Sequence, residues 1–192
     1  MVKYINKLLS IIMFICTGVL CYRELISWKY DRLFSYISIV IVVLIPMVLK
    51  KTKFRLEEKD KLILNIFIFL ADFLGCIVNL YNKIWWFDIF THYLSGAFTF
   101  LCAIFVLKRM GRYDDKNMWF NILFGMGIVF LCAGVWEMLE FSSDCIFNIN
   151  LQHNLDTGVC DTMEDIIAAF AGSIIFVIVY IINFRRKINS YE

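Results

Sequence analysis

The chain of 192 residues is strongly apolar: hydrophobic residues make up 61% of it and charged residues 19%, against about 45–50% and about 25% in soluble domains. A single soluble domain of this length cannot bury so much apolar surface. The composition therefore excludes a cytosolic enzyme, a nucleic-acid-binding protein and a disordered chain, while the formal net charge of +2 is close to neutral.

Six apolar stretches are long enough to cross a lipid bilayer as helices. About 17–25 apolar residues span the hydrocarbon core, where every backbone polar group has to be satisfied within the segment. The stretches are residues 8–26, 33–49, 62–80, 85–107, 118–139 and 164–184, and the one long connection is the outer loop, residues 140–163. We therefore predict an all-α, polytopic integral membrane protein in which residues 1–192 form a single transmembrane domain of six helices.

The basic residues predict the orientation of these helices. Cytoplasmic loops of membrane proteins carry an excess of Lys and Arg. If the N-terminus lies inside, the inner segments 3–7, 50–61, 108–116 and 185–187 hold 15 of the 19 Lys and Arg residues. We therefore expect both the N- and C-termini to be cytoplasmic and the loop 140–163 to face outward.

Ionisable residues inside the expected spans gather at the outer ends of the later helices. Such residues are costly in a bilayer and persist where they face the bundle interior and find partners. Asp88 and His92 lie one helical turn apart at the start of their helix, and small residues share the same helix faces. The predicted site comprises Asp88, His92, Glu137, Asp161 and Asp165, with Asp72, Ser95, Glu140 and Glu164 as supporting polar residues.

These residue types suit a divalent metal ion bound mainly by oxygen. His92 together with Asp88, Glu137 and Asp165 would coordinate Mg²⁺, Mn²⁺ or Fe²⁺. The only other histidine is His153, so a zinc site with three histidines is excluded. A metal-free alternative uses His92 as a general base that Asp88 orients.

Two of the seven cysteines lie in the outer loop. Cys145 and Cys160 share this loop, where an oxidising compartment permits a disulfide that would staple it. The sequence does not supply the geometry that such a bridge requires, so a disulfide and two free thiols both stay open.

Three stretches resemble families of bacterial membrane proteins. They read WFDIFTHYLSGAF from Trp86, GVWEMLEF from Gly134 and CDTMEDIIAAFAG from Cys160. In this order they resemble the YjdF-like inner-membrane proteins and, more distantly, the VanZ-like proteins. The resemblance implies a multi-pass protein of the bacterial plasma membrane and no established reaction. The segment Glu137-Met-Leu-Glu140 departs from the VanZ pattern, so a role in glycopeptide resistance is not carried over.

Three functions are compatible with the polar cluster. The first is a metal-assisted enzyme that modifies a lipid or another envelope substrate. The second is a proton- or cation-coupled transporter in which Asp72 takes part in a proton relay; with so few helices, alternating access would require a homo-oligomer. In the third, a structural or accessory protein, the same groups only fix helix packing. Each of the three has the lipid bilayer as its surroundings, and none involves nucleic acid.

Overall fold

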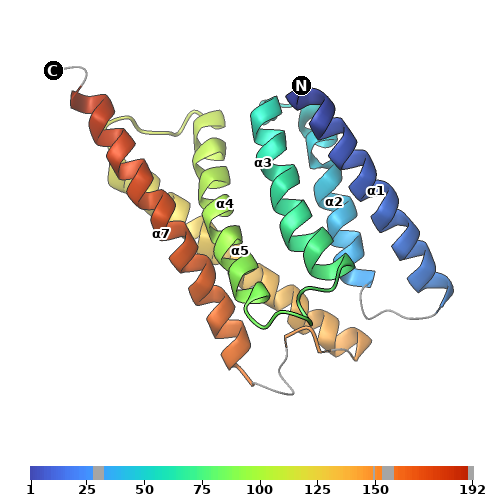
Figure 1. The fold of residues 1–192 in the computed structure, drawn as a ribbon. Coiled ribbons are helices and arrows are strands. Elements are labelled where there is room, and N and C mark those ends of the chain that lie inside the picture. Colours follow the sequence, from blue (N-terminus) through green and yellow to red (C-terminus); the bar gives the residue numbers. More distant parts are fainter. Residues whose placement is uncertain (28–32, 149, 153–157, 190–192) are drawn as a thin grey trace. The chain divides into compact units, whose positions relative to one another are not determined.

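A computed structural model describes residues 1–27, 33–148, 150–152 and 158–189, and it contains helices and no strand within these ranges (Figure 1). In chain order the elements are α1 (Val2–Ile26), α2 (Leu33–Val48), the 3₁₀ turn η1 (Leu49–Lys51), α3 (Glu58–Ile68), the π-helix η2 (Phe69–Ile77), α4 (Phe87–Arg109), α5 (Met118–Phe147) and α7 (Cys160–Asn189). The all-α prediction is therefore confirmed. The chain divides into two compact units, residues 1–88 and 89–192, which are described separately.

In the first unit, α1, α2 and α3 pack against one another and alternate in direction (Figure 1). Buried polar side chains join α1 to α3. The Asn6 side chain donates to the backbone oxygen of Glu58 at 2.8 Å, and Ser10 donates to Asn65 at 3.2 Å. Because a polar group in an apolar interior needs a partner, these bonds select the helix faces that meet.

The third apolar stretch is divided between α3 and the π-helix η2. A capping box of Glu57 and Asp60 starts α3. At the far end, Asn79 takes the left-handed conformation, with φ of 66°. Tyr81 then folds back, packs its ring where Gly75 has no side chain, and donates to the carbonyl oxygen of Ala71 at 2.9 Å. The predicted helix 62–80 is therefore interrupted in its hydrogen-bonding pattern and ends in a turn.

Four helices within the described residues are long and apolar enough to cross a membrane: α1, α4, α5 and the part of α7 up to Arg186. Their most apolar stretches are only 17% to 33% buried inside the molecule, as expected for helices that face lipid. The helix α2 has 16 residues and a length of about 24 Å, which is less than the hydrocarbon thickness of about 30 Å. The count of six spans therefore stays a prediction.

The second unit consists of α4, α5 and α7, with α4 and α7 running in the same direction (Figure 1). Its core contains Phe100 and Ile104 of α4, Val129 of α5 and Ala169 of α7. The side chain of Phe100 also fills the space above Gly125, where a Cβ atom would lie 2.5 Å from the ring. Large and small residues therefore interlock at the centre of this unit.

The connection between α5 and α7 is shorter than the predicted loop 140–163, because α5 continues to Phe147 and α7 begins at Cys160. This part of α5 contains neither Pro nor Gly, so nothing stops the helix where the apolar stretch ends. The hydroxyls of Ser142 and Ser143 bond to carbonyl oxygens of the preceding turn. The helix ends at Asn148, which is left-handed with φ of 54°.

Candidate functional site

The helices α4 and α7 approach so closely that their backbones touch. A Cβ atom on Gly96 would lie 1.7 Å from the carbonyl oxygen of Ala169, and one on Gly172 would lie 1.8 Å from that of Tyr93. Only glycine fits at these two positions, because any side chain would push the helices apart. The contact lies one helical turn from His92 on α4 and from Asp165 on α7, so it sets the separation of these two side chains.

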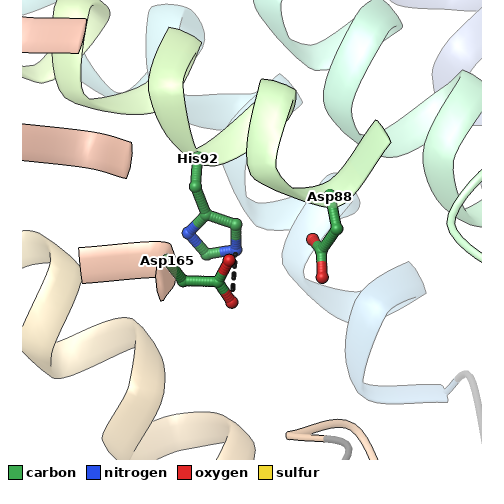
Figure 2. A group of neighbouring side chains, drawn as sticks. All are labelled: Asp88, His92 and Asp165. Carbon is green, nitrogen blue, oxygen red and sulfur yellow. Dashed lines mark ion pairs between the residues drawn. The ribbon is translucent and has the colours of Figure 1, made fainter. Parts of the chain in front are cut away.

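Three ionisable side chains meet beside this contact. Asp88 and His92 project from α4 and Asp165 projects from α7, and their ligand atoms all lie within 4.8 Å of one another (Figure 2). His92 Nε2 is 3.4 Å from Asp165 Oδ2, and these two side chains are 12% and 3% exposed. We call Asp88, His92 and Asp165 the triad. Asp88 is the last residue of the first unit, but the continuous helix α4 fixes its place relative to His92.

The separation of His92 and Asp165 suits two ligands of a common metal ion. A hydrogen bond between nitrogen and oxygen usually measures about 2.7–3.2 Å, so the 3.4 Å between His92 and Asp165 is longer than usual. Two ligand atoms that are each about 2.1 Å from one ion lie about 3.0–3.4 Å apart at ordinary coordination angles. The donor set, one imidazole and two carboxylates, is compatible with Mn²⁺, Fe²⁺ or Mg²⁺.

Glu137 is buried on α5 but does not join the triad: among the described residues, its carboxylate is not one of the ligand atoms that lie within 4.8 Å of one another. One partner of Glu137 is Gln152, whose Nε2 donates to the backbone oxygen of Glu137 at 3.2 Å and to Glu137 Oε2 at 3.4 Å. The same nitrogen donates to Thr162 Oγ1 at 3.2 Å. Glu137 therefore connects α5 to the first turn of α7, one turn before Asp165.

The other predicted site residues have separate places. Asp161 is half-buried in the first turn of α7, whereas Glu164 is exposed. Ser95 donates to the carbonyl oxygen of His92 at 2.7 Å, and Glu140 accepts a hydrogen bond from the Trp136 indole at 2.9 Å. These contacts are local to one helix, so they assign neither Ser95 nor Glu140 a place in the triad.

The remaining predictions concern a disulfide and two residues whose side chains the structure does not describe. Cys145 and Cys160 are exposed and have free thiols, so the structure does not form the disulfide between them. The side chain of Asp72, on which the transporter hypothesis rests, and the whole of His153 lie outside the described residues.

The sequence analysis missed Gln152 and Asp144. The carboxylate of Asp144 accepts from the backbone N–H groups of Leu151 and Gln152, at 2.6 and 3.1 Å, and so positions the Gln152 amide. Neither residue belongs to an apolar helical stripe, and both fall in the expected loop. The one available signal was the pair Asn148 and Asn150 between the two residues, since asparagine is typical of turns.

Comparison with known proteins gives one family and one relative. Residues 7–186 match the family described as "Predicted membrane protein (DUF2238)". An uncharacterized protein of Thermotoga maritima is 31% identical over 130 residues, which cover 66% of this chain and 65% of that protein. The similarity thus spans slightly less than two thirds of the relative's length. No solved structure matches the chain.

Proposed function

We propose that this chain, which belongs to the DUF2238 family of predicted membrane proteins, with which the resemblance to YjdF-like proteins agrees, is a membrane metalloenzyme. In this proposal, Asp88, His92 and Asp165 hold one divalent ion between α4 and α7. The ion would assist the modification of a lipid or another envelope substrate. The observation that carries the proposal is the gathering of one imidazole and two carboxylates, with ligand atoms within 4.8 Å of one another, on apolar helices.

The proposed location is the bacterial plasma membrane, which the chain would cross six times with both termini in the cytoplasm. The distribution of basic residues supports this orientation. In it, the triad lies toward the outer end of α4 and α7, at a depth that the head groups and upper chains of outer-leaflet lipids also reach.

The chain's own groups favour water as the nucleophile. The Ser95 hydroxyl, one turn from His92 on α4, donates to the carbonyl oxygen of His92, so its proton is committed to its own helix. With only these three protein ligands, a bound ion would also be able to bind water and an oxygen of the substrate. A bound divalent ion lowers the pKa of such a water and polarises the bond that it attacks. A carboxylate oxygen of Asp88 or Asp165 that does not bind the ion would accept the proton that water releases.

The metal content of the purified protein tests this proposal. Wild-type protein is expected to hold about one equivalent of divalent metal by elemental analysis. His92→Ala and Asp165→Asn should lose it, because each removes a ligand. The matched control is Glu164→Gln, which changes an exposed acid next to Asp165 and should keep the metal.

Thermal unfolding separates metal binding from a purely structural role. A ligand that binds the folded state raises the unfolding temperature, so Mn²⁺ should stabilise the wild type and Glu164→Gln but not His92→Ala. If no metal binds, and if His92→Ala only lowers stability, the triad serves helix packing and the enzyme proposal is wrong.

A further inference from the structure

A cavity lies at the opposite end of α4 from the triad. This cavity of about 410 Å³ opens where α4 ends and α5 begins, within the usual size range of ligand pockets. Its apolar wall includes Leu107, Phe120 and Phe124, and its polar rim includes Arg112, Asp114 and Asn117. The cavity therefore combines an apolar surface with one cation and one anion.

The position of this cavity relative to the membrane follows from its helices. Both α4 and α5 are long and apolar enough to span, so the connection 110–117 between them lies at a membrane surface. Trp119, in the first turn of α5, is exposed, and tryptophan is enriched at the level of lipid head groups. The ligands available at this depth are phospholipids.

Hydrogen bonds hold the backbone of the charged rim in place, while the side chains of Arg112 and Asp114 are exposed. Gly111, with φ of 70°, caps α4: its N–H donates to Lys108 O and the Arg112 N–H donates to Leu107 O, both at 3.1 Å. Asn121 is fully buried and binds the backbone of Asp114 twice, at 2.7 and 3.2 Å. Because the backbone of this rim is already ordered, it loses little entropy when a ligand binds.

The neighbouring basic side chains are directed to aromatic rings. Lys108 lies 4.9 Å from the centre of the Tyr113 ring, and Arg109 lies 5.1 Å from that of Phe105. The cation that lines the cavity is Arg112, and the acid beside it is Asp114. A ligand that pairs with both side chains would carry an anion and a hydrogen-bond-donating cation.

We propose that this cavity binds a phospholipid whose head group contains a phosphate and a primary ammonium. Arg112 donates to the phosphate oxygens, as guanidinium groups do in bidentate pairs. The carboxylate of Asp114 accepts from the ammonium group, and the wall formed by Leu107, Phe120 and Phe124 covers the first part of an acyl chain. A purely anionic head group would bring its charge next to Asp114, and a choline head group has no N–H to donate.

Lipid retention by the purified full-length protein tests the proposal. The protein is incubated in mild detergent with equal amounts of phosphatidylethanolamine, phosphatidylcholine and phosphatidylglycerol, and the bound lipid is measured by native mass spectrometry. Wild type should retain phosphatidylethanolamine about tenfold more than either of the other two, the ratio expected from one charge-assisted hydrogen bond.

The Asp114 variant is a conservative probe. Asp114 Oδ1 accepts from the Lys116 backbone N–H at 2.8 Å, and asparagine keeps this bond, so Asp114→Asn removes the charge without removing the turn. It should abolish the preference for phosphatidylethanolamine over phosphatidylcholine. Arg112→Gln should lower the retention of all three lipids, whereas the control variants Arg109→Gln and Asp115→Asn should behave as wild type.

Several results would overturn the assignment. Equal retention of phosphatidylethanolamine and phosphatidylcholine by the wild type would exclude recognition of the ammonium group. Stronger retention of phosphatidylglycerol would identify an anion site instead. A preference that survives in Asp114→Asn, or retention unaffected by Arg112→Gln, would place the bound lipid elsewhere on the protein.

Discussion

The contact between α4 and α7 predicts the effect of adding one methyl group at Gly96. In Gly96→Ala the new Cβ atom would lie 1.7 Å from the carbonyl oxygen of Ala169, whereas real contacts are at least 3.0 Å. Because a backbone oxygen cannot rotate away, the two helices have to separate by about 1.3 Å at this point. Overpacking of this kind costs about 1–3 kcal/mol of unfolding free energy.

The same separation acts on the triad one turn away. His92 Nε2 and Asp165 Oδ2 are 3.4 Å apart, and metal sites tolerate displacements of only about 0.5 Å. Gly96→Ala should therefore weaken metal binding by about tenfold or more, although it changes no ligand.

Unfolding by detergent titration and metal titration of the same samples measure both effects. The control is Gly127→Ala on α5, where a Cβ atom would meet nothing within 4 Å; it should leave stability and metal binding unchanged or slightly raise stability. If Gly96→Ala is as stable as Gly127→Ala and binds metal equally well, the close approach of α4 and α7 does not position the triad.

Three further predictions concern other parts of the molecule. Gln152→Leu should lower the unfolding free energy by about 1–3 kcal/mol, because it leaves the buried carboxylate of Glu137 without its amide donor; denaturation in detergent measures this, and an unchanged midpoint would contradict it. Hydrogen bonds from Lys61 and Asn6 lower the pKa of Glu58 from its ordinary value of 4.5. The ionised Glu58 side chain therefore contributes its full stabilisation above pH 4.5, and this contribution is lost as the pH falls through the lowered pKa of the folded state. Glu58→Gln should accordingly reduce the loss of thermal stability in acid, and an unaltered pH profile would refute this reasoning. With the proposed orientation, a membrane-impermeant maleimide added to intact cells should label Cys145, which is exposed near the end of α5. Labelling only after cell lysis would reverse the orientation.

Composition and hydropathy predicted the helical class and the approximate positions of the long helices in the described part of the chain. They did so because lipid-facing residues have to be apolar over a fixed length, whatever the packing inside the bundle. The predicted ends were less accurate. An apolar stretch marks the part of a helix that contacts lipid, whereas the helix itself continues until a residue such as Asn148 or Gly111 ends it.

Within the predicted polar cluster, the sequence indicated most directly which residues of the same helix lie close together. The spacing of Asp88 and His92 by four residues places them on the same face of α4. No sequence pattern indicated which acid from another helix would join them, and Glu137, Asp161 and Asp165 were all candidates. In the structure, Asp165 meets His92 while Glu137 bonds to Gln152.

The sequence by itself therefore determined that this is an apolar, all-helical chain whose acids and single helical histidine gather near the starts and ends of particular helices. These features depend on local composition and on the 3.6-residue period. Only the tertiary structure decided which side chains meet. That outcome depends on the backbone contact of Gly96 with Ala169 and of Gly172 with Tyr93, because the absence of two side chains lets α4 and α7 approach closely enough for His92 to reach Asp165.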